Sequence, residues 1–142
     1  PYPREVVDSW ISYLQKSFEQ GTAYEFALFL KESGRYIGNC GLVTVSKTHK
    51  NAEVGYFIDV SQWGNGYATE ACKKIIDFGF QDHQLNRIYS RCMVRNIASR
   101  KVMEKCGMVW EGRHKQEFLK GNVYEDMDYL AILAEDYFKT KD

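Results

Sequence analysis

The sequence lacks net charge and long apolar runs, and each absence narrows the possible functions. Nineteen Lys and Arg residues balance nineteen Asp and Glu residues, so no overall field would draw the chain to nucleic acid or to an anionic membrane. No apolar run approaches the roughly 20 residues that a membrane-spanning helix needs. No signal-peptide pattern opens the chain. We therefore expect a cytoplasmic protein, with neither nucleic acid nor membrane among its partners.

Paired cysteine motifs are also missing. The four cysteines, Cys40, Cys72, Cys92 and Cys106, form no C-x-x-C pair and have no histidine at zinc-site spacing. We therefore expect free, mostly buried thiols and no metal. The 142 residues are enough for one domain with a sizeable core.

Two glycines mark the most informative stretch, QWGNGYATEA at residues 62–71. It follows a strand-like run, Ala52 to Val60, and opens an amphipathic helical run, Tyr67 to His83. The first N–H groups of a helix lack partners and carry partial positive charge, so a phosphate can bind there. Gly64 and Gly66 would let the backbone approach such a ligand and adopt positive φ.

Two familiar phosphate-binding loops do not fit this stretch. A P-loop requires Lys and then Ser or Thr after its last glycine, but Tyr67 and Ala68 follow here. A dinucleotide-binding fingerprint requires a third glycine, and Thr69 occupies that position. An ordinary turn that contains two glycines is the alternative reading.

Apolar periodicity predicts the other elements. We expect a helix from Pro3 to near Gly21, a hairpin of strands 25–31 and 36–45, a strand at 87–94, a short helix from Asn96 to Gly107, and a closing hairpin of strands 108–119 and 123–133. Because a helix bridges strands 52–60 and 87–94, these two are expected to be parallel. The predicted fold class is α/β: a mixed, mostly antiparallel sheet with one central parallel pair and helices on both faces.

The order of these motifs, with Asn96-x-x-Ser99 and the segment EKCGM at 104–108, resembles the GCN5-related N-acetyltransferase (GNAT) superfamily. It is most similar to the branch of ribosomal-protein alanine N-acetyltransferases, over about Tyr24 to Leu133. The resemblance implies a splayed central strand pair and acetyl-CoA as cosubstrate. Members of this branch usually carry a further strand and helix before this chain's first residue. We therefore expect residues 1–142 to form a single N-acetyltransferase domain that lacks them.

The same resemblance implies where acetyl-CoA binds. The pantetheine arm would lie between the splayed strands, and the pyrophosphate would lie on the amides of Gly64 to Ala68. Trp63 stands where the superfamily's loop usually has Gln or Arg. The residues expected to contact the cofactor are Phe57, Ile58, Asp59, Val60, Trp63, Gly64, Asn65, Gly66, Tyr67, Ala68, Thr69, Asn96 and Ser99.

Catalytic roles follow from the same resemblance. Many members use a tyrosine to protonate the leaving thiolate, but Met103 occupies that position here. Ser99 is the candidate acid instead; the alternative is a first-turn hydroxyl that bonds Asn96. The base is assigned from strand position instead: Glu53 lies on the strand that enters the site, on the same face as Gly55 and Phe57, and is the candidate base, directly or through water. The alternative is a solvated carboxylate or a partner of a nearby Lys. An amide near Ile58 would stabilise the oxyanion.

The acceptor is expected to be a primary amine. An α-amine with a pKa near 8 is about 10% neutral at pH 7, but a lysine side chain only about 0.04%, so a protein or peptide N-terminus is favoured. The alternatives are a small amine (an antibiotic, a polyamine or an amino acid) and a non-catalytic acyl-CoA-binding module. Tyr124 and Asp126 are candidate acceptor-binding residues, or plain cross-strand neighbours. Exposed Tyr124 and Tyr129 would permit a homodimer.

Overall fold

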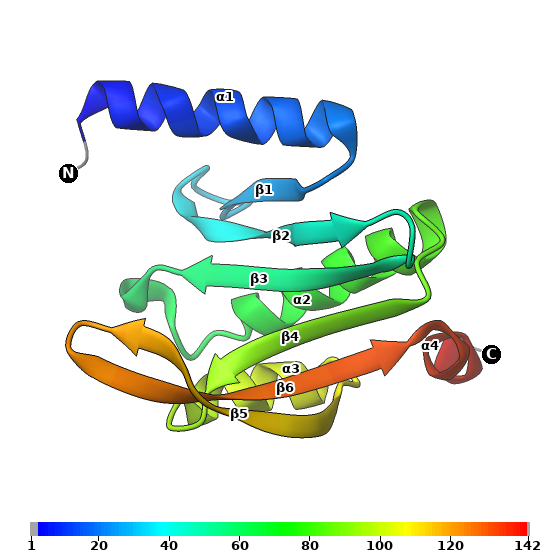
Figure 1. Cartoon of the computed structure of the whole chain (residues 1–142). Coiled ribbons are helices and arrows are strands. Elements are labelled where there is room, and N and C mark those ends of the chain that lie inside the picture. The colour runs from blue at the N-terminus through cyan, green and yellow to red at the C-terminus, as the bar shows by residue number, and fades with distance from the viewer. Residues whose placement is uncertain (1–2, 142) are drawn as a thin grey trace.

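The computed structural model describes residues 3–141, which form a six-stranded sheet with helices (Figure 1). The strand order is β1-β2-β3-β4-β6-β5, and among neighbouring strands only the pair β3 and β4 is parallel. This mixed sheet confirms the predicted fold class. The elements are α1 (Arg4–Gln20), β1 (Tyr24–Phe29), β2 (Tyr36–Ser46), β3 (Asn51–Ile58), a 3-10 turn η1 (Val60–Gln62), α2 (Tyr67–Asp77), a π-helical turn η2 (Phe78–Asp82), β4 (Arg87–Met93), α3 (Ile97–Lys105), β5 (Val109–Lys120), β6 (Val123–Leu133) and α4 (Ala134–Lys141).

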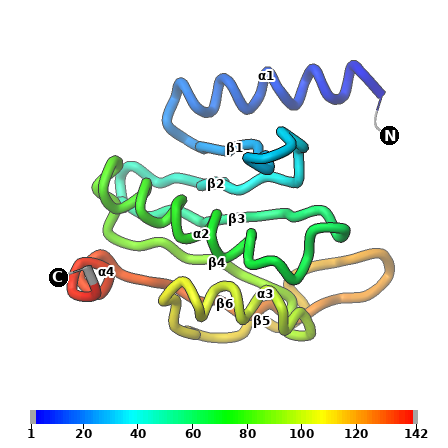
Figure 2. Tube along the Cα trace, turned by 180° about the vertical axis from the view of Figure 1, so that it is seen from behind, coloured from blue at the N-terminus to red at the C-terminus, as the bar shows by residue number. Residues whose placement is uncertain are grey.

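The helices α2 and α3 lie on the same face of the sheet (Figure 2). α2 connects β3 to β4, and α3 connects β4 to β5, which runs parallel to β4 because both pair antiparallel with β6. Both crossovers move in the same direction across the sheet, so one handedness puts both helices on one face. α1 lies beside β1 at the sheet edge, and α4 follows β6 (Figure 1). The expectation of helices on both faces overlooked this shared direction.

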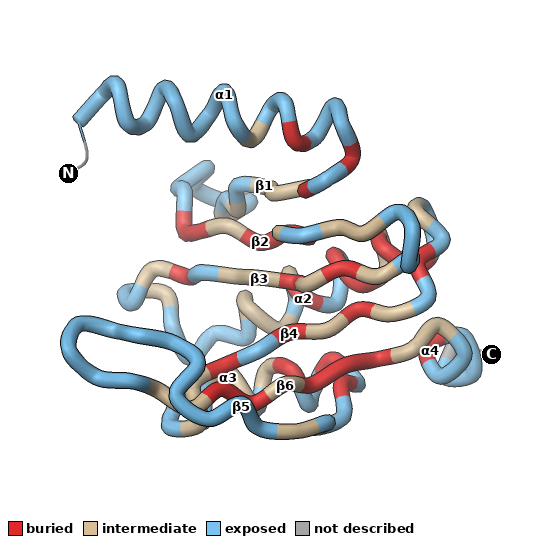
Figure 3. The backbone as a smooth tube through the Cα atoms, viewed as in Figure 1, coloured by how far each residue is buried: buried red, intermediate tan, exposed pale blue. Residues whose placement is uncertain are grey.

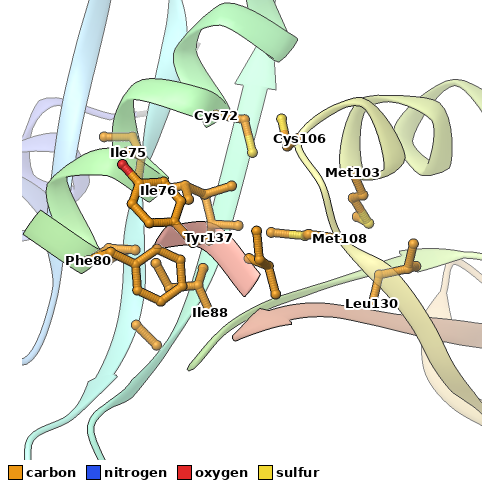
Figure 4. Close-up of a cluster of buried hydrophobic side chains, with 14 of the residues drawn as sticks. Cys72, Ile75, Ile76, Phe80, Ile88, Met103, Cys106, Met108, Leu130 and Tyr137 are labelled. Atoms are coloured by element: carbon orange, nitrogen blue, oxygen red, sulfur yellow. The ribbon is translucent and has the colours of Figure 1, made fainter. Parts of the chain in front are cut away.

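The core fills the space between these two helices and the sheet. Figure 4 shows Cys72 of α2 facing Cys106 at the end of α3, with Ile75 and Ile76 of α2 on one side of Met108 and Met103 of α3 on the other. Each large apolar side chain buried in this way contributes about 1.5–3 kcal/mol. All four cysteines are free and buried, as predicted.

A buried carboxylate fixes the closing hairpin to α3. Asp128 on β6 is 1% exposed, and it accepts hydrogen bonds from Arg113 Nε and Trp110 Nε1 of β5, each at 3.0 Å. Arg100 Nη1 of α3 donates to its other oxygen at 3.3 Å. These bonds lower the pKa of Asp128, the Arg113 bond most, against the opposing effect of burial. The ionised carboxylate therefore ties together α3, β5 and β6, three consecutive elements of the chain.

The N-terminal helix contacts the sheet mainly through its last turn. Phe18 packs edge-on against Tyr24 and Phe26, with ring centroids 5.0 and 6.0 Å apart. Most of α1 is exposed (Figure 3), and Trp10 is 47% exposed. The predicted amphipathic helix is therefore present, with its apolar stripe largely open. Within residues 3–141, no helix combines the length and apolar character needed to span a bilayer.

Candidate active site

The two central strands separate after three paired positions. Asn51, Ala52 and Glu53 pair with residues 87–89. At the next position, Ser90 Oγ donates to the backbone carbonyl of Val54 at 2.8 Å. Ser90 is 3% exposed, so this hydroxyl satisfies a buried carbonyl that the parallel ladder no longer reaches. The splayed pair implied by the family resemblance is therefore present.

A cleft of about 720 Å³ opens where the strands diverge. β3, β4, the start of α3 and the β5–β6 hairpin form its walls. Its lining residues are Tyr56, Phe57, Arg91, Cys92, Met93, Asn96, Ser99, Phe118, Leu119, Lys120, Gly121 and Met127. Three of the predicted site residues, Phe57, Asn96 and Ser99, are thus brought together, although Phe57 and Ser99 are far apart in the sequence.

Hydrogen bonding to β2 decides which β3 backbone groups face this cleft. Asp59 N donates to Ile37 O at 2.7 Å, and Ile58 lies opposite Gly38. Antiparallel pairs alternate between bonded and non-bonded positions. The N–H and C=O groups of Ile58 and Tyr56 therefore point away from β2 and toward the gap. The backbone groups of Phe57 and Asp59 point toward β2 instead, where they can form the hydrogen bonds of the antiparallel ladder.

The strand also ends earlier than the sequence pattern predicted. β3 stops at Ile58, and Val60 begins η1 and is 66% exposed. Asp59 causes the change, because its carboxylate accepts from Ser61 N at 3.3 Å and from Ser61 Oγ at 3.1 Å. Such a local side-chain bond to the backbone competes with strand continuation. The extended run predicted to Val60 is therefore wrong in its last two residues.

The glycine stretch forms the predicted turn at a helix N-terminus. Gly64 and Gly66 have φ of 81° and 77°, and a Cβ on either would meet no heavy atom within 4 Å. Gly66 is the N-cap of α2, which has no side-chain cap among the described residues. The first N–H groups of α2, at the positive end of the helix dipole, therefore have no side-chain cap from Gly66. This arrangement fits a pyrophosphate.

Trp63 anchors the loop to the cleft wall. Its indole Nε1 donates to Ile58 O at 2.8 Å. The residue at the position where the superfamily usually has Gln or Arg therefore bonds the protein's own backbone. Asn65 lies at the exposed tip, with Nδ2 donating to Gln62 O at 3.0 Å.

Ser99 has a partner that the sequence analysis missed. Its backbone N donates to Asn96 Oδ1 at 3.1 Å, so Asn96 caps α3 as predicted. Its Oγ lies 2.6 Å from Tyr56 Oη, and the same phenol oxygen lies within hydrogen-bond distance of Ser99 O, at 3.0 Å. Burial raises the pKa of Tyr56, and the bond to Ser99 opposes that rise. In the sequence, Tyr56 alternates in step with apolar residues on one face of β3, which is typical of a core residue. Only the separation of β3 from β4 makes it part of the cleft wall.

Position 103 faces the core in this chain. Met103 is 1% exposed and does not line the cleft. Ser99 is therefore the hydroxyl of α3 that the cleft contains.

Glu53 lies at the paired end of β3, outside the cleft lining. Arg91, which does line the cleft, donates from Nε to Glu53 Oε2 at 3.2 Å and from Nη1 to Glu117 Oε1 at 2.9 Å. Glu117 also bonds His114 and Tyr129. Burial tends to raise the pKa of Glu117, but these hydrogen bonds lower it overall. Arg91 therefore stands between two carboxylates at the cleft wall.

The two candidate acceptor residues lie on the hairpin beside the cleft. Tyr124 is 62% exposed and pairs with Leu119, which lines the cleft. Asp126 Oδ1 accepts from Gln116 N at 2.8 Å, inside the irregular part of β5. The loop of the β5–β6 hairpin is coloured as exposed in Figure 3. Neither side chain is part of the cleft lining, so their contact with an acceptor stays a prediction.

Metal chemistry has no evident ligand set in the part of the chain that the structure describes. No group of three or more His, Cys, Asp or Glu side chains there could hold a metal ion.

Comparison with known proteins agrees with this geometry. The acetyltransferase (GNAT) domain family matches residues 1–109. The "Probable N-acetyltransferase YjcK" of Bacillus subtilis (strain 168) is 34% identical over 127 residues, which are 89% of this chain and 70% of that protein.

Two solved structures share the fold at a TM-score of 0.87 and 25% identity. They are a ribosomal-protein-S5-alanine acetyltransferase from Vibrio fischeri, with 94% of this chain and 73% of that one covered, and mutant forms of the spermidine/spermine N-acetyltransferase SpeG from Vibrio cholerae, with 99% and 84% covered. The chain therefore belongs to the GNAT family of acetyl-CoA-dependent acetyltransferases.

Proposed function

We propose that this domain acetylates the α-amine of a protein or peptide N-terminus. The observation that carries the proposal is the charge of the cleft lining, which includes Arg91 and Lys120 and, within residues 3–141, no carboxylate. Glu53 and Glu117 lie outside the lining, and both are bonded to Arg91, so the cleft surface itself offers a polycation no negative side chain. An N-terminal α-amine carries a single charge, and much less free energy is needed to remove its proton.

The cosubstrate would be held mainly by backbone. Bound acetyl-CoA supplies an acetyl group activated as a thioester, with coenzyme A as leaving group. The cleft-facing backbone N–H and C=O of Tyr56 are available to pair with a pantetheine arm. The loop of residues 63–69 would offer helix N–H groups to the pyrophosphate, and Phe57 and Asn96, which line the cleft, would contact the pantetheine arm.

The reaction would use donors and acceptors that this chain already orients. The Ile58 N–H faces the gap and is the donor we assign to the acetyl oxygen as negative charge develops. Ser99 Oγ is the hydroxyl we assign to the leaving sulfur. Glu53 would accept the amine proton through water, because it lies outside the cleft lining and Arg91 stands between.

The proton that the base must remove favours an α-amine as the acceptor. The pKa of an α-amine lies about 2.5 units below that of a lysine side chain, which corresponds to about 3.4 kcal/mol less free energy for deprotonation. Glu53 already accepts a guanidinium hydrogen bond, so it is poorly placed to supply that difference. A polyamine is the second candidate, and the observation in its favour is the structural likeness to a spermidine/spermine N-acetyltransferase.

The test is release of free CoA thiol from acetyl-CoA, with N-terminal peptides, spermidine, aminoglycosides and amino acids as acceptors. The proposal predicts a kcat/KM for the best peptide at least about tenfold above that for spermidine. A higher value for spermidine would refute it.

Glu53→Gln tests the proposed base. It should lower kcat by about 10² or more, the usual scale of general base effects. The matched control is Glu111→Gln, because Glu111 is another strand carboxylate bound to an arginine, Arg87 Nη2, at 2.6 Å. Equal losses in the two variants would show that Glu53 has no special role.

A further inference from the structure

The phenol of Tyr56 faces two acceptors on one residue. Its Oη lies 2.6 Å from Ser99 Oγ and 3.0 Å from Ser99 O. A phenol has one proton to donate. When it donates to the carbonyl, the Ser99 hydroxyl must donate back to Tyr56. When it donates to Ser99 Oγ, the Ser99 proton is free to point elsewhere.

The surroundings of Ser99 make the cleft the available direction for that proton. Asn96 Oδ1 already holds the backbone N–H of Ser99, and Tyr56 occupies the hydroxyl from the β3 side. Both Tyr56 and Ser99 line the cleft, and they come from its opposite walls. Tyr56 therefore spans the splayed gap and fixes the rotamer of a serine hydroxyl that lies within it.

We infer that Tyr56 is a positioning residue that turns the Ser99 hydroxyl toward the leaving sulfur, and that Ser99 stabilises the departing thiolate by a hydrogen bond without giving up its proton. This inference rests on the proposed function. In the transfer, a bond forms between the amine nitrogen and the acetyl carbon, and the carbon–sulfur bond breaks with its electron pair leaving on sulfur. The amine proton goes to Glu53 through water.

The burial of Tyr56 supports these two roles. Because burial raises the pKa of Tyr56, the phenol is a poor source of a proton to replace one lost by Ser99. A thiol ionises near pH 8.5, so the thiolate is a fair leaving group once it is hydrogen-bonded. The pair therefore acts as an oriented hydrogen-bond donor and ends each turnover with both protons in place.

Kinetics provide the first test. Tyr56→Phe keeps the ring and should lower kcat about tenfold, with the KM for acetyl-CoA changed less than about twofold; tenfold corresponds to about 1.4 kcal/mol. Ser99→Ala should cause a similar loss, and the double variant should lose no more than either single one, because both act through one hydroxyl. Tyr24→Phe, on β1 among aromatic side chains, is the control and should keep wild-type kcat. Multiplicative losses in the double variant would overturn the inference.

Binding provides a second test that needs no acceptor. The dissociation constants of CoA and of desulfo-CoA, which lacks the thiol, are measured from pH 6 to pH 10. The wild type should favour CoA increasingly as the pH rises, because the Ser99 hydroxyl binds the thiolate. Tyr56→Phe and Ser99→Ala should lose about tenfold of that preference at high pH.

The two tests separate the inference from the function on which it rests. An unchanged CoA preference in folded Ser99→Ala protein would overturn the inference, even if Tyr56→Phe failed to fold. If the variants lose the CoA preference but spermidine is the better acceptor, the proposed acceptor is refuted and the role of the Tyr56–Ser99 pair is supported.

Discussion

A methyl group added to the proposed phosphate loop should weaken CoA binding, whereas the same change in another glycine turn should cost the same stability and leave CoA binding unchanged. Gly66 has a φ of 77°, and Gly34, in the turn between β1 and β2, has a φ of 72°. A Cβ on either meets no heavy atom within 4 Å. Gly66→Ala and Gly34→Ala should therefore pay the same backbone cost, about 1–2 kcal/mol for a left-handed residue. The two variants differ in whether the new methyl group would meet the pyrophosphate of bound CoA.

The magnitude follows from the helix N-terminus that Gly66 caps. A hydrogen bond to a charged group contributes about 1.5–3 kcal/mol, and about 1.4 kcal/mol changes affinity tenfold. Loss of one phosphate contact should raise the Kd for CoA by about tenfold or more in Gly66→Ala. Gly34→Ala should bind CoA as the wild type does.

Calorimetric titration with CoA and with pantetheine, which lacks the pyrophosphate, measures both effects. Pantetheine should bind equally to the two variants and to the wild type, because it does not reach the loop. Urea unfolding should give equal stability losses for the two variants. Equal CoA affinities in the two variants would refute the assignment of this loop to the pyrophosphate.

Three further predictions concern stability. Asp128→Asn should lower the free energy of unfolding by about 2–3 kcal/mol, the scale of lost charge-assisted hydrogen bonds, whereas exposed Asp82→Asn should change it by less than about 0.5 kcal/mol; urea unfolding at pH 7 measures both. Because Arg113 lowers the pKa of Asp128 in the folded state, this stabilisation is present above the unfolded pKa, near 4, and is lost as the pH falls through the folded value. The wild type should therefore lose more stability than Asp128→Asn between pH 5 and pH 2, and parallel curves would contradict this reasoning. Ser90→Ala should cost about 1–3 kcal/mol by leaving the buried Val54 carbonyl without its 2.8 Å bond; an unchanged urea midpoint would contradict that role.

Features set by neighbouring residues could be predicted from the sequence. The turn at Gly64 and Gly66, the N-cap at Asn96 and the crossover between β3 and β4 all depend on short spacings. Each of these features depends on residues that are close together in the sequence, so the elements and their order could be predicted, whereas the ligand of the glycine turn could not be read from its spacing alone.

Features set by distant contacts could not be predicted. Tyr56 lies on the same face of β3 as the core residues Ala52 and Val54, and only the separation of the strands at Ser90 gives it a place in the cleft. The Arg91 bridge from Glu53 to Glu117 joins three strands, so no spacing in the sequence reveals it. The face shared by α2 and α3 depends on the position of β6 between β4 and β5.

The most direct measurement is a competition at pH 7 between spermidine and a peptide that has a free N-terminus and one internal lysine. Wild-type protein is incubated with acetyl-CoA and equal concentrations of both amines, and mass spectrometry locates the acetyl group. The proposed function predicts acetylation of the peptide α-amine, with about tenfold less product on spermidine and none on the lysine side chain. Preferential acetylation of spermidine or of the lysine would contradict it.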